Sequence, residues 1–278
     1  MCIFYSDHHG DGFRFRLFRQ RRQAVRTTPV FRVIIAALIL LVGFGHSLAL
    51  AEHGPQTFAQ SGASVVKVLP TWPGYDRPGF GAPAGTAPEG SGVFLSPNLT
   101  SEETRYIITS AHVVGKATRI EVVDHTGQRG DARLVGLDAN SDIALLEAQD
   151  FTGSSIQITA RQSPLIGSHV CALGNPFGLG NSLSCGVVSA VNRKAGFQPI
   201  EDFIQTDAAV NPGMSGGALV DAKGHLLGMI NAIYTKEADI DAGVNFAIST
   251  DLLLDVLKTL SPEFCRSVDA SPLLSPCD

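Results

Sequence analysis

Residues 211–219 read Asn-Pro-Gly-Met-Ser-Gly-Gly-Ala-Leu, a glycine-rich turn that runs directly into the apolar segment Ala218–Val220. Glycine permits the positive φ angles and close backbone approaches that tight turns need. The same arrangement, a short apolar run bounded by Gly, Asn, Asp or Pro, recurs from residue 65 to residue 248. Regular short strands separated by turns indicate a β-sandwich or β-barrels and not a βαβ fold.

The predicted strands fall into two sets. The first set comprises Val65–Leu69, Gly92–Ser96, Tyr106–Thr109, Ile120–Asp124, Ala132–Leu137 and Ile143–Glu147. The second set comprises Ile156–Thr159, His169–Leu173, Ser184–Val191, Phe203–Thr206, Ala218–Val220, Leu226–Ile233 and Val244–Ile248. One helix is predicted over residues 250–260, because Ser249 or Thr250 can cap it, its leucines and valine form one apolar face, and Pro262 ends it.

Residues 1–51 have the composition of an export leader. They hold seven Arg, no Lys and two Asp, whereas the rest of the chain carries 14 basic and 24 acidic residues, a net charge of −10. A basic region precedes the apolar run Val33–Gly45, and Ala49-Leu50-Ala51 forms a small-residue cleavage site. The apolar run is shorter than the roughly 20 residues that span a bilayer. We therefore predict a cleaved signal peptide and a periplasmic or secreted protein, with a membrane anchor over residues 33–51 as the alternative.

The charge of the remaining chain also bears on its partners. Nucleic-acid affinity depends mainly on Lys and Arg contacts with phosphates, so an acidic chain is a poor match and nucleic acid is not an expected partner. Residues 70–90 contain ten Gly or Pro and are predicted to form a long loop. Such a loop is either a plain surface loop or one that regulates the protein or contacts a partner.

Cysteine usage agrees with export. Cys2 lies in the leader, and the other four cysteines allow three connectivities. The local pairing Cys171–Cys185 with Cys265–Cys277 is predicted, and each bridge would close a loop worth about 3 kcal/mol in the chain-entropy model. Free buried thiols are the alternative. No Cys or His spacing indicates a metal site, and no cofactor is expected.

Three segments place a reactive side chain at the edge of an apolar run or in a turn: IITSAH ending at His112, NSDIALL with Asp142, and NPGMSGGA with Ser215. Amide hydrolysis by serine needs a histidine that removes the hydroxyl proton and a carboxylate that orients the histidine. The glycines around Ser215 allow backbone N–H groups to point at a developing oxyanion. Each signal alone is modest, but the three together in this order predict a hydrolase. The rival histidines, His125, His169 and His225, are interpreted as structural or solvated.

The motifs TSAHVV, SDIALL, GNPFGLG, QTDAAVNPGMSGGALVD and NFAI resemble those of the trypsin-like serine proteases, and within them the HtrA/Deg-type protease domain. The resemblance covers about residues 62–260. It implies an all-β fold of two packed six-stranded antiparallel β-barrels, chymotrypsin-like, with a C-terminal helix. The expected protease domain is residues 52–262, with barrels at about 62–155 and 156–248 and a tail over residues 263–278.

The resemblance also implies the roles of individual residues. His112 would be the general base, Asp142 its orienting carboxylate and Ser215 the nucleophile. The backbone N–H groups of Gly213 and Ser215 would form the oxyanion hole, where one donor is typically worth about 3–4 kcal/mol to the transition state. The implied activity is that of a serine endopeptidase that cleaves proteins or peptides through an acyl-enzyme. A role in protein quality control outside the cytoplasm is a weaker implication.

Two residues depart from the family pattern. Met214 stands where zymogen-derived relatives have Asp and where the HtrA/Deg type has Asn. No carboxylate is therefore available there for a newly cut N-terminal amine, and active-site order should depend on loops such as residues 174–181 or 70–90. Ala218 stands where Pro is common, and little effect is expected.

The resembled fold places the base of the primary specificity pocket at Ala209. Because Ala209 has no carboxylate to attract Lys or Arg, we predict cleavage after small or medium aliphatic residues. The expected walls are Val210, Ile230, Asn231, Ala232, Asn245, Phe246 and Ala247.

HtrA/Deg-type proteases usually carry a PDZ domain, which captures peptides by β-augmentation. Only eighteen residues follow Leu260, so no such domain is expected here. A monomer is expected, with a trimer as the alternative. Two other functions are alternatives: a catalytically silent binding protein on the same scaffold, and an α/β-hydrolase esterase, which would need the order Ser–Asp–His. The order His112, Asp142, Ser215 favours the endopeptidase.

Overall fold

The computed structural model describes residues 53–73, 89–97, 101–158, 163–233 and 243–264, and for residues 232 and 233 the backbone alone. The predicted leader, most of the long loop over residues 70–90 and the predicted Cys265–Cys277 bridge lie outside the described residues. No helix within the described ranges has both the length and the apolar character needed to cross a membrane.

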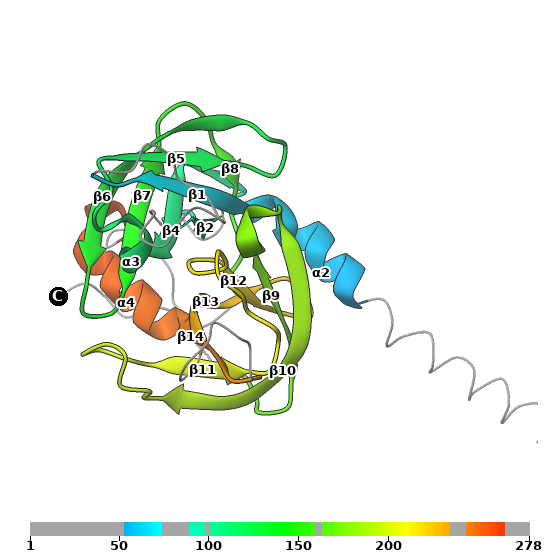
Figure 1. The fold of residues 1–278 in the computed structure, drawn as a ribbon. Helices are drawn as coiled ribbons and strands as arrows, with labels where there is room; N and C mark the ends of the chain where they lie inside the picture. The colour runs from blue at the N-terminus through cyan, green and yellow to red at the C-terminus, as the bar shows by residue number, and fades with distance from the viewer. Residues whose placement is uncertain (1–52, 74–88, 98–100, 159–162, 234–242, 265–278) are drawn as a thin grey trace, which may run out of the picture. The chain divides into compact units, whose positions relative to one another are not determined.

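Six strands of the N-terminal half close into an antiparallel barrel in the order β1-β2-β4-β7-β6-β5 (Figure 1). Their bounds are β1 (Val65–Thr71), β2 (Gly90–Phe94), β4 (Tyr106–Ser110), β5 (Arg119–Val123), β6 (Arg129–Asp138) and β7 (Ile143–Ala148). A separate two-stranded sheet pairs β3 (Glu103–Thr104) with β8 (Gly153–Ser154).

Six strands of the C-terminal half close into a second antiparallel barrel in the order β10-β11-β14-β13-β12-β9. Their bounds are β9 (His169–Gly174), β10 (Ser182–Arg193), β11 (Phe203–Thr206), β12 (Ala218–Asp221), β13 (Leu226–Ile233) and β14 (Asn245–Ser249). The predicted fold class, two six-stranded antiparallel barrels of the chymotrypsin type, is confirmed.

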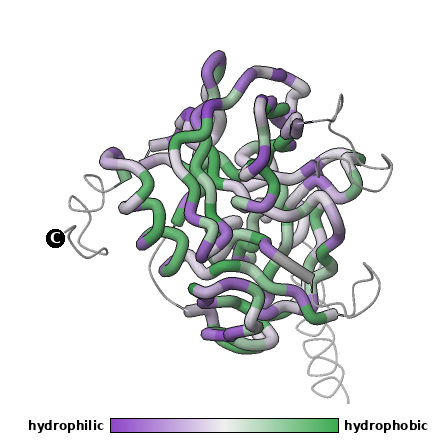
Figure 2. Tube along the Cα trace, turned by 60° about the vertical axis from the view of Figure 1, so that its left-hand side comes forward, coloured by the Kyte–Doolittle hydropathy of each residue, from purple (hydrophilic) through white to green (hydrophobic). Residues whose placement is uncertain are grey.

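Neighbouring residues of one strand enter different parts of the core, because successive side chains point to opposite faces. In β4, Ile107 packs inside the first barrel, whereas Ile108 packs in a cluster that contains residues of both barrels. In β7, Leu146 likewise packs inside the first barrel, and Leu145 packs in the cluster shared by both barrels. Figure 2 shows the resulting apolar stretches along strands and the last helix, with hydrophilic residues at turns. This double burial explains why the sequences of β4 and β7 are largely apolar without strict alternation.

The C-terminal helix α4 (Thr250–Leu260) contacts β6 and β7 of the first barrel and β13 and β14 of the second. Ser249 caps it, since its hydroxyl oxygen accepts a hydrogen bond from the N–H of Leu252 at 3.2 Å. The remaining helical segments are α2 (His53–Ser61), η1 (Gly62–Ser64), α3 (Ala111–Val114) and η2 (Pro176–Gly178). Of these, α2 was not predicted from the sequence.

One predicted strand, Ile156–Thr159, is wrong over its described part, where residues 156–158 form no strand. These residues connect the two barrels. The N–H of Ile156 donates to Phe94 of the first barrel, and Gln157 accepts from the N–H of Leu226 in the second. Ile156 is 2% exposed and belongs to the cluster shared by both barrels. Its burial in that cluster, and not strand pairing, accounts for its apolar side chain.

Candidate active site

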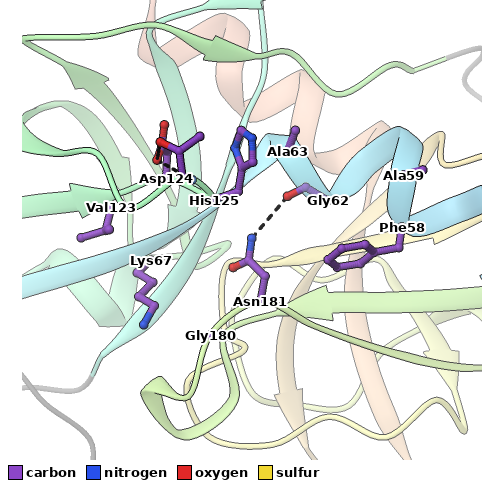
Figure 3. A pocket seen from close by; sticks show the side chains of 12 residues that line it. Phe58, Ala59, Gly62, Ala63, Lys67, Val123, Asp124, His125, Gly180 and Asn181 are labelled. Atoms are coloured by element: carbon purple, nitrogen blue, oxygen red, sulfur yellow. Dashed lines mark hydrogen bonds between the residues drawn. The ribbon is translucent and has the colours of Figure 1, made fainter. Parts of the chain in front are cut away.

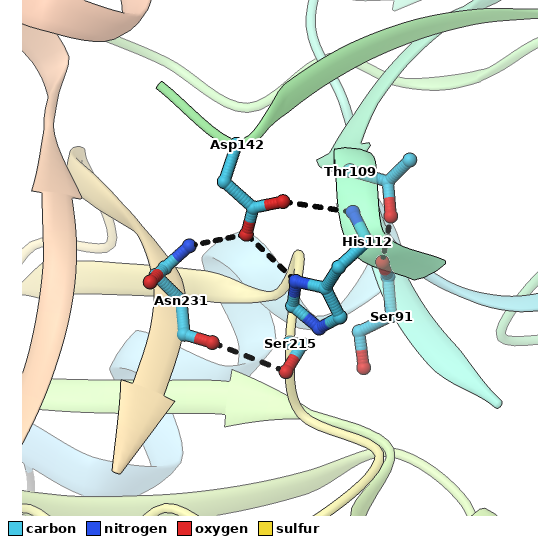
Figure 4. A network of polar contacts seen from close by, with 6 residues as sticks. All are labelled: Ser91, Thr109, His112, Asp142, Ser215 and Asn231. Atoms are coloured by element: carbon cyan, nitrogen blue, oxygen red, sulfur yellow. Dashed lines mark hydrogen bonds and ion pairs between the residues drawn. The ribbon is translucent and has the colours of Figure 1, made fainter. Parts of the chain in front are cut away.

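The three predicted reactive residues come from different elements and from both barrels. His112 lies on the short helix α3, directly after β4, and Asp142 immediately precedes β7, so both belong to the first barrel. Ser215 lies between β11 and β12 of the second barrel. Figure 4 shows the three side chains at one place, with the hydroxyl of Ser215 beside the imidazole ring of His112.

Asp142 holds His112 at two points. Its Oδ1 accepts the backbone N–H of His112 and its Oδ2 contacts Nδ1 of the ring, both at 2.7 Å. With Nδ1 hydrogen-bonded to the carboxylate, Nε2 of the ring is left to accept a proton. Asp142 is only 5% exposed, so few water molecules compete for its oxygens.

The backbone of Asp142 is also constrained. Its φ angle is +59°, a left-handed conformation that aspartate tolerates better than most residues. Its carbonyl accepts the N–H of Ala111 at 3.1 Å. The backbone of Asp142 is thus held between the start of β7 and the start of α3.

Asn231 makes a third contact with Asp142, one that the sequence reading missed. Its Nδ2 donates to Oδ2 of Asp142 at 2.6 Å, and its backbone carbonyl accepts the hydroxyl of Ser215 at 3.2 Å (Figure 4). Asn231 belongs to β13, so this amide connects the second barrel to the carboxylate of the first. From the sequence, Asn231 is predicted only as part of a pocket wall. No neighbouring residue marks its contact with Asp142, which lies 89 positions away.

The hydroxyl of Ser215 has a hydrogen-bond partner other than His112 in this structure. Within the described residues its hydroxyl donates to Asn231, and no hydrogen bond joins it to His112. In structures without substrate, such catalytic contacts are often long and tighten when substrate binds. A rotation of the Ser215 side chain toward the adjacent ring would bring the hydroxyl to Nε2.

The turn before Ser215 orients two backbone N–H groups. The N–H of Met214 donates to the carbonyl of Asn211 at 3.0 Å, Pro212 is the second residue, and Gly213 is the third with φ +95°. Pro followed by a positive-φ glycine fits a type II turn. Among the residues that the structure describes, the N–H groups of Gly213 and Ser215 have no acceptor. They are free to bind an anionic oxygen.

Two glycines are required here for steric reasons as well. A Cβ on Gly213 would lie 2.5 Å from the carbonyl oxygen of Asn175, and one on Gly216 would lie 2.2 Å from that of Ser91. Gly216 also has φ +86°, which disfavours any L side chain. The glycine-rich sequence around Ser215 therefore reflects both backbone conformation and close packing.

The loop over residues 174–181 packs directly against this turn. The N–H of Phe177 donates to the carbonyl of Pro212 at 2.8 Å. The loop is held to β1 in turn, because Lys67 Nζ donates to the carbonyl of Gly178 at 3.0 Å and Asn181 Nδ2 donates to that of Val65 at 3.0 Å. The conformation of the turn over residues 211–214, called the oxyanion turn from here on, is thus linked to a loop anchored on the first barrel.

The residues predicted to form the specificity pocket lie in several environments. Val210, Ile230 and Ala247 pack inside the second barrel, whereas the ring of Phe246 meets that of Phe197 edge to face and lies tilted against that of Phe203. Ala209 is exposed, Asn245 donates to the carbonyl of Ala208, and the side chain of Ala232 lies outside the description. Because residues 245, 246 and 247 alternate faces along β14, their side chains do not share one wall. The pocket itself stays a prediction.

A surface hollow of about 780 Å³ lies elsewhere, between the α2–η1 segment, β1 and the β5–β6 turn (Figure 3). Its lining includes Phe58, Lys67, His125 and Asn181, and it contains none of His112, Asp142 and Ser215. His225, another rival histidine, binds Asp221 within a turn. These positions leave His112 as the histidine beside Ser215 among those described.

One group of described residues has the composition of a metal site. His169, Cys171 and Cys185 place their ligand atoms within 4.8 Å of one another. However, Cys171 and Cys185 form a disulfide between β9 and β10. Cysteine binds metals as a thiolate, so in the oxidised protein this group offers only the imidazole of His169.

The trypsin-like peptidase domain family matches residues 90–229, about half of the chain, and the chain belongs to this family. Within the family its similarity is to HtrA-type proteases. It is 39% identical over 166 residues to the periplasmic serine endoprotease DegP of Escherichia coli (strain K12), a match that covers 59% of this chain and 34% of DegP. It is 38% identical over 174 residues to the serine endoprotease DegS of Haemophilus influenzae, covering 62% of this chain and 49% of DegS.

Solved structures give the same result. The HtrA-type protease AlgW with tripeptide superposes with a TM-score of 0.65 at 33% identity, covering 74% of this chain and 62% of that one. The serine endoprotease from Yersinia pestis superposes with a TM-score of 0.57 at 32% identity, covering 74% and 65%. The match spans about a third of DegP and about half of DegS, so the similarity concerns one part of these longer relatives.

Proposed function

We propose that this protein is a serine endopeptidase that hydrolyses peptide bonds of proteins through Ser215, His112 and Asp142. The observation that carries the proposal is the meeting of these three side chains beside two unpartnered N–H groups, those of Gly213 and Ser215. A base, a nucleophile and oxyanion donors at one place are what acyl transfer requires.

In the proposed reaction, His112 Nε2 takes the proton of Ser215 as Oγ attacks the carbonyl carbon of the substrate. Asp142 stabilises the imidazolium that forms, and the N–H groups of Gly213 and Ser215 bind the negative oxygen of the tetrahedral intermediate. His112 then protonates the leaving amine, and the acyl-enzyme remains. Water, activated by the same imidazole, hydrolyses the acyl-enzyme and restores Ser215.

A fluorophosphonate probe tests the assignment, because it forms a covalent bond only with an activated serine. We expect the wild-type protein to be labelled and to digest casein, and Ser215→Ala and His112→Ala to lose both activities. His125→Ala, which changes a histidine outside the site, serves as the control and should behave as wild type. Labelling that persists in Ser215→Ala would refute the nucleophile. A wild type that is neither labelled nor active would favour the alternative, a silent binding protein.

We further propose cleavage after small or medium aliphatic residues. Support comes from Ala209, which supplies no charge at the expected pocket base. An unbiased peptide library should show cleavage after Val, Ala or Leu in preference to Lys or Arg. Equal or faster cleavage after Lys or Arg would rule out this specificity.

We propose that residues 1–51 direct export to the periplasm and are then removed, leaving residues 52–262 as the protease domain and residues 263–278 as a tail. The basic and apolar segments of the leader support this, as does the periplasmic location stated for DegP. N-terminal sequencing of the exported protein should begin at Glu52. A membrane-bound chain that keeps residues 33–51 would favour the anchor.

We propose a monomer, and sedimentation of the exported protein distinguishes it from the trimer. We also propose a role in protein quality control outside the cytoplasm, which the resemblance of the sequence motifs to the HtrA/Deg type implies. Accumulation of misfolded exported proteins in cells that carry Ser215→Ala would support that role.

A further inference from the structure

Ser91 lies at the start of β2, fully buried, between the turn that precedes Ser215 and the loop over residues 174–181. Its backbone contacts both Ser215 and a residue of β4. Its N–H donates to the carbonyl of Ser215 at 2.8 Å, and its carbonyl accepts the hydroxyl of Thr109 at 2.7 Å. The position of Ser91 relative to the nucleophile is therefore set by the main chain, whatever its side chain does.

The side chain of Ser91 makes two further contacts. Its hydroxyl donates to the carbonyl of Gly213 at 2.7 Å and accepts the N–H of Asn175 at 2.8 Å. Asn175 is fully buried, so water does not replace either partner readily. One hydroxyl thus connects the first barrel to the oxyanion turn and to the loop that packs on it.

These contacts hold both peptide planes next to Gly213. A trans peptide points its C=O and N–H in opposite directions. The carbonyl of Pro212 is held by Phe177, which directs the N–H of Gly213 the other way, and the carbonyl of Gly213 is held by Ser91. Ser91 also fixes Asn175, two residues before Phe177. Ser91 therefore acts directly on the peptide plane that follows Gly213. It acts through the loop on the peptide plane that precedes Gly213.

The side chain of Met214 does not add a hydrogen bond that would hold the turn. Its thioether is buried among the apolar residues of the second barrel and supplies no strong hydrogen bond to the surrounding main chain. Beyond the hydrogen bond from the N–H of Met214 to the carbonyl of Asn211, the turn is held by residues from outside it. Ser91 is the side chain in the described part of the chain that donates to the carbonyl of Gly213.

We propose that Ser91 is a positioning residue for the oxyanion hole: its hydroxyl holds Gly213 and Asn175 so that the N–H of Gly213 faces the carbonyl oxygen of the substrate. The inference rests on the proposed endopeptidase function. It goes beyond that function by assigning the order of the oxyanion turn to a first-barrel side chain outside the triad.

The test compares Ser91→Ala with Ser61→Ala in the full exported protein. Ser61 is also a fully buried serine whose hydroxyl donates to a backbone carbonyl, that of Thr57 at 2.6 Å, but it lies on α2. Loss of one oxyanion donor lowers kcat by about 100- to 1000-fold, so a misdirected donor should lower it by about 10- to 100-fold. We expect Ser91→Ala to show this loss with KM changed less than about twofold, because the contact acts in the transition state.

Two further readouts separate positioning from general destabilisation. A peptide aldehyde, whose tetrahedral adduct places an oxygen in the oxyanion hole, should bind Ser91→Ala weaker by about the same factor as kcat falls. A non-covalent peptide of the same sequence should bind unchanged. The shape of the pH profile of kcat/KM should also stay the same, since the contacts of His112 with Asp142 are intact. Ser91→Cys keeps a side-chain donor, a weak one, on a slightly larger group and should give intermediate activity, so it replaces Ser91→Ala if that variant does not fold.

The proposal is overturned if Ser91→Ala matches Ser61→Ala in kcat, or if the aldehyde and the non-covalent peptide weaken equally. Failure of the underlying function looks different. In that case the wild type itself is inactive or unlabelled, or Ser215→Ala keeps its activity. An active wild type, an inactive Ser215→Ala and an unaffected Ser91→Ala would refute the role of Ser91 alone.

Discussion

At the scale of the residue, Asp142 accepts three hydrogen bonds: two from His112 and one from Asn231. Hydrogen bonds to a charged group contribute about 1.5–3 kcal/mol, roughly twice the value of neutral ones. Because Asp142 is buried, its carboxylate depends on these protein donors. The amide of Asn231 is the only one of the three that comes from the second barrel.

Asn231→Ala should lower the free energy of unfolding by about 1–3 kcal/mol, since a buried carboxylate loses one donor. It should also lower kcat by about tenfold, because the orientation of Asp142 sets that of His112. Denaturant unfolding and peptide hydrolysis measure the two effects. Asn231→Ser, which keeps a short donor, should recover part of both. A kcat equal to that of the wild type would show that the two donations from His112 suffice to hold the carboxylate.

At the scale of the element, the connection between β10 and β11 is organised around Glu201. Its carboxylate accepts the backbone N–H groups of Ala195, Gly196, Phe197 and Gln198. Burial by itself raises the pKa of Glu201, but these four donors together outweigh it and hold the pKa below its ordinary value of 4.5. The same connection donates from the N–H of Ile200 to the carbonyl of Asn140, two residues before Asp142.

A carboxylate with a lowered pKa stabilises the fold above its unfolded-state pKa, and this contribution is lost as pH falls through the folded-state value. Between about pH 6 and pH 3, the wild type should therefore lose stability more steeply than Glu201→Gln. Urea unfolding across this range measures the two slopes. The exposed Glu102→Gln is the control and should keep the wild-type slope. Equal slopes for wild type and Glu201→Gln would mean that the four donors stabilise charged and neutral side chains alike.

The disulfide joins β9 to β10 at a directly paired position, Cys171 opposite Cys185. In the chain-entropy model, a loop of this length is worth about 3 kcal/mol. The double variant Cys171→Ala, Cys185→Ala should lose about that much in urea unfolding. Reduction of the wild type with dithiothreitol should reproduce most of the loss. An unchanged midpoint in both cases would show that the hairpin pairing already limits the unfolded chain.

At the scale of the whole molecule, the candidate site exists only where the two barrels meet. His112 and Asp142 come from the first, and Ser215 and Asn231 from the second. Helix α4 contacts both barrels and buries Leu253 and Leu257 completely. It therefore connects the halves of the site without contributing a reactive group.

Leu257→Ala should lower the free energy of unfolding by about 2–5 kcal/mol, the usual cost of deleting a buried leucine side chain. It should also lower kcat, because looser docking of the barrels misaligns Ser215 relative to His112. Leu165→Ala is a matched control, since Leu165 is 80% exposed. Calorimetry with steady-state kinetics tests both effects. Lost stability with unchanged kcat would mean that the barrel interface keeps its geometry without full helix packing.

The sequence by itself determined the strand-rich fold, the helix over residues 250–260 and the identity of the three reactive residues proposed here. These features have local signals: apolar runs between turn residues, Ser249 as a cap, and glycines around Ser215. Strand bounds were close for the same reason, as for β4 and β13. The strand predicted from Ile156 onward is wrong because burial between the two barrels selects the same apolar residue type as burial in a strand.

The contacts of Asn231 and Ser91 are visible in the tertiary structure alone. The hydrogen-bond partners of these residues lie 89 and 122 positions away, so no neighbouring residue in the sequence marks the contacts. The same holds for the predicted pocket, whose consecutive strand residues divide between the barrel interior and other surroundings. Local sequence sets the conformation of each segment, whereas the packing of two closed barrels determines which distant polar groups meet. The turn before Ser215 is therefore in contact with the first barrel through Ser91, in addition to having its own glycines.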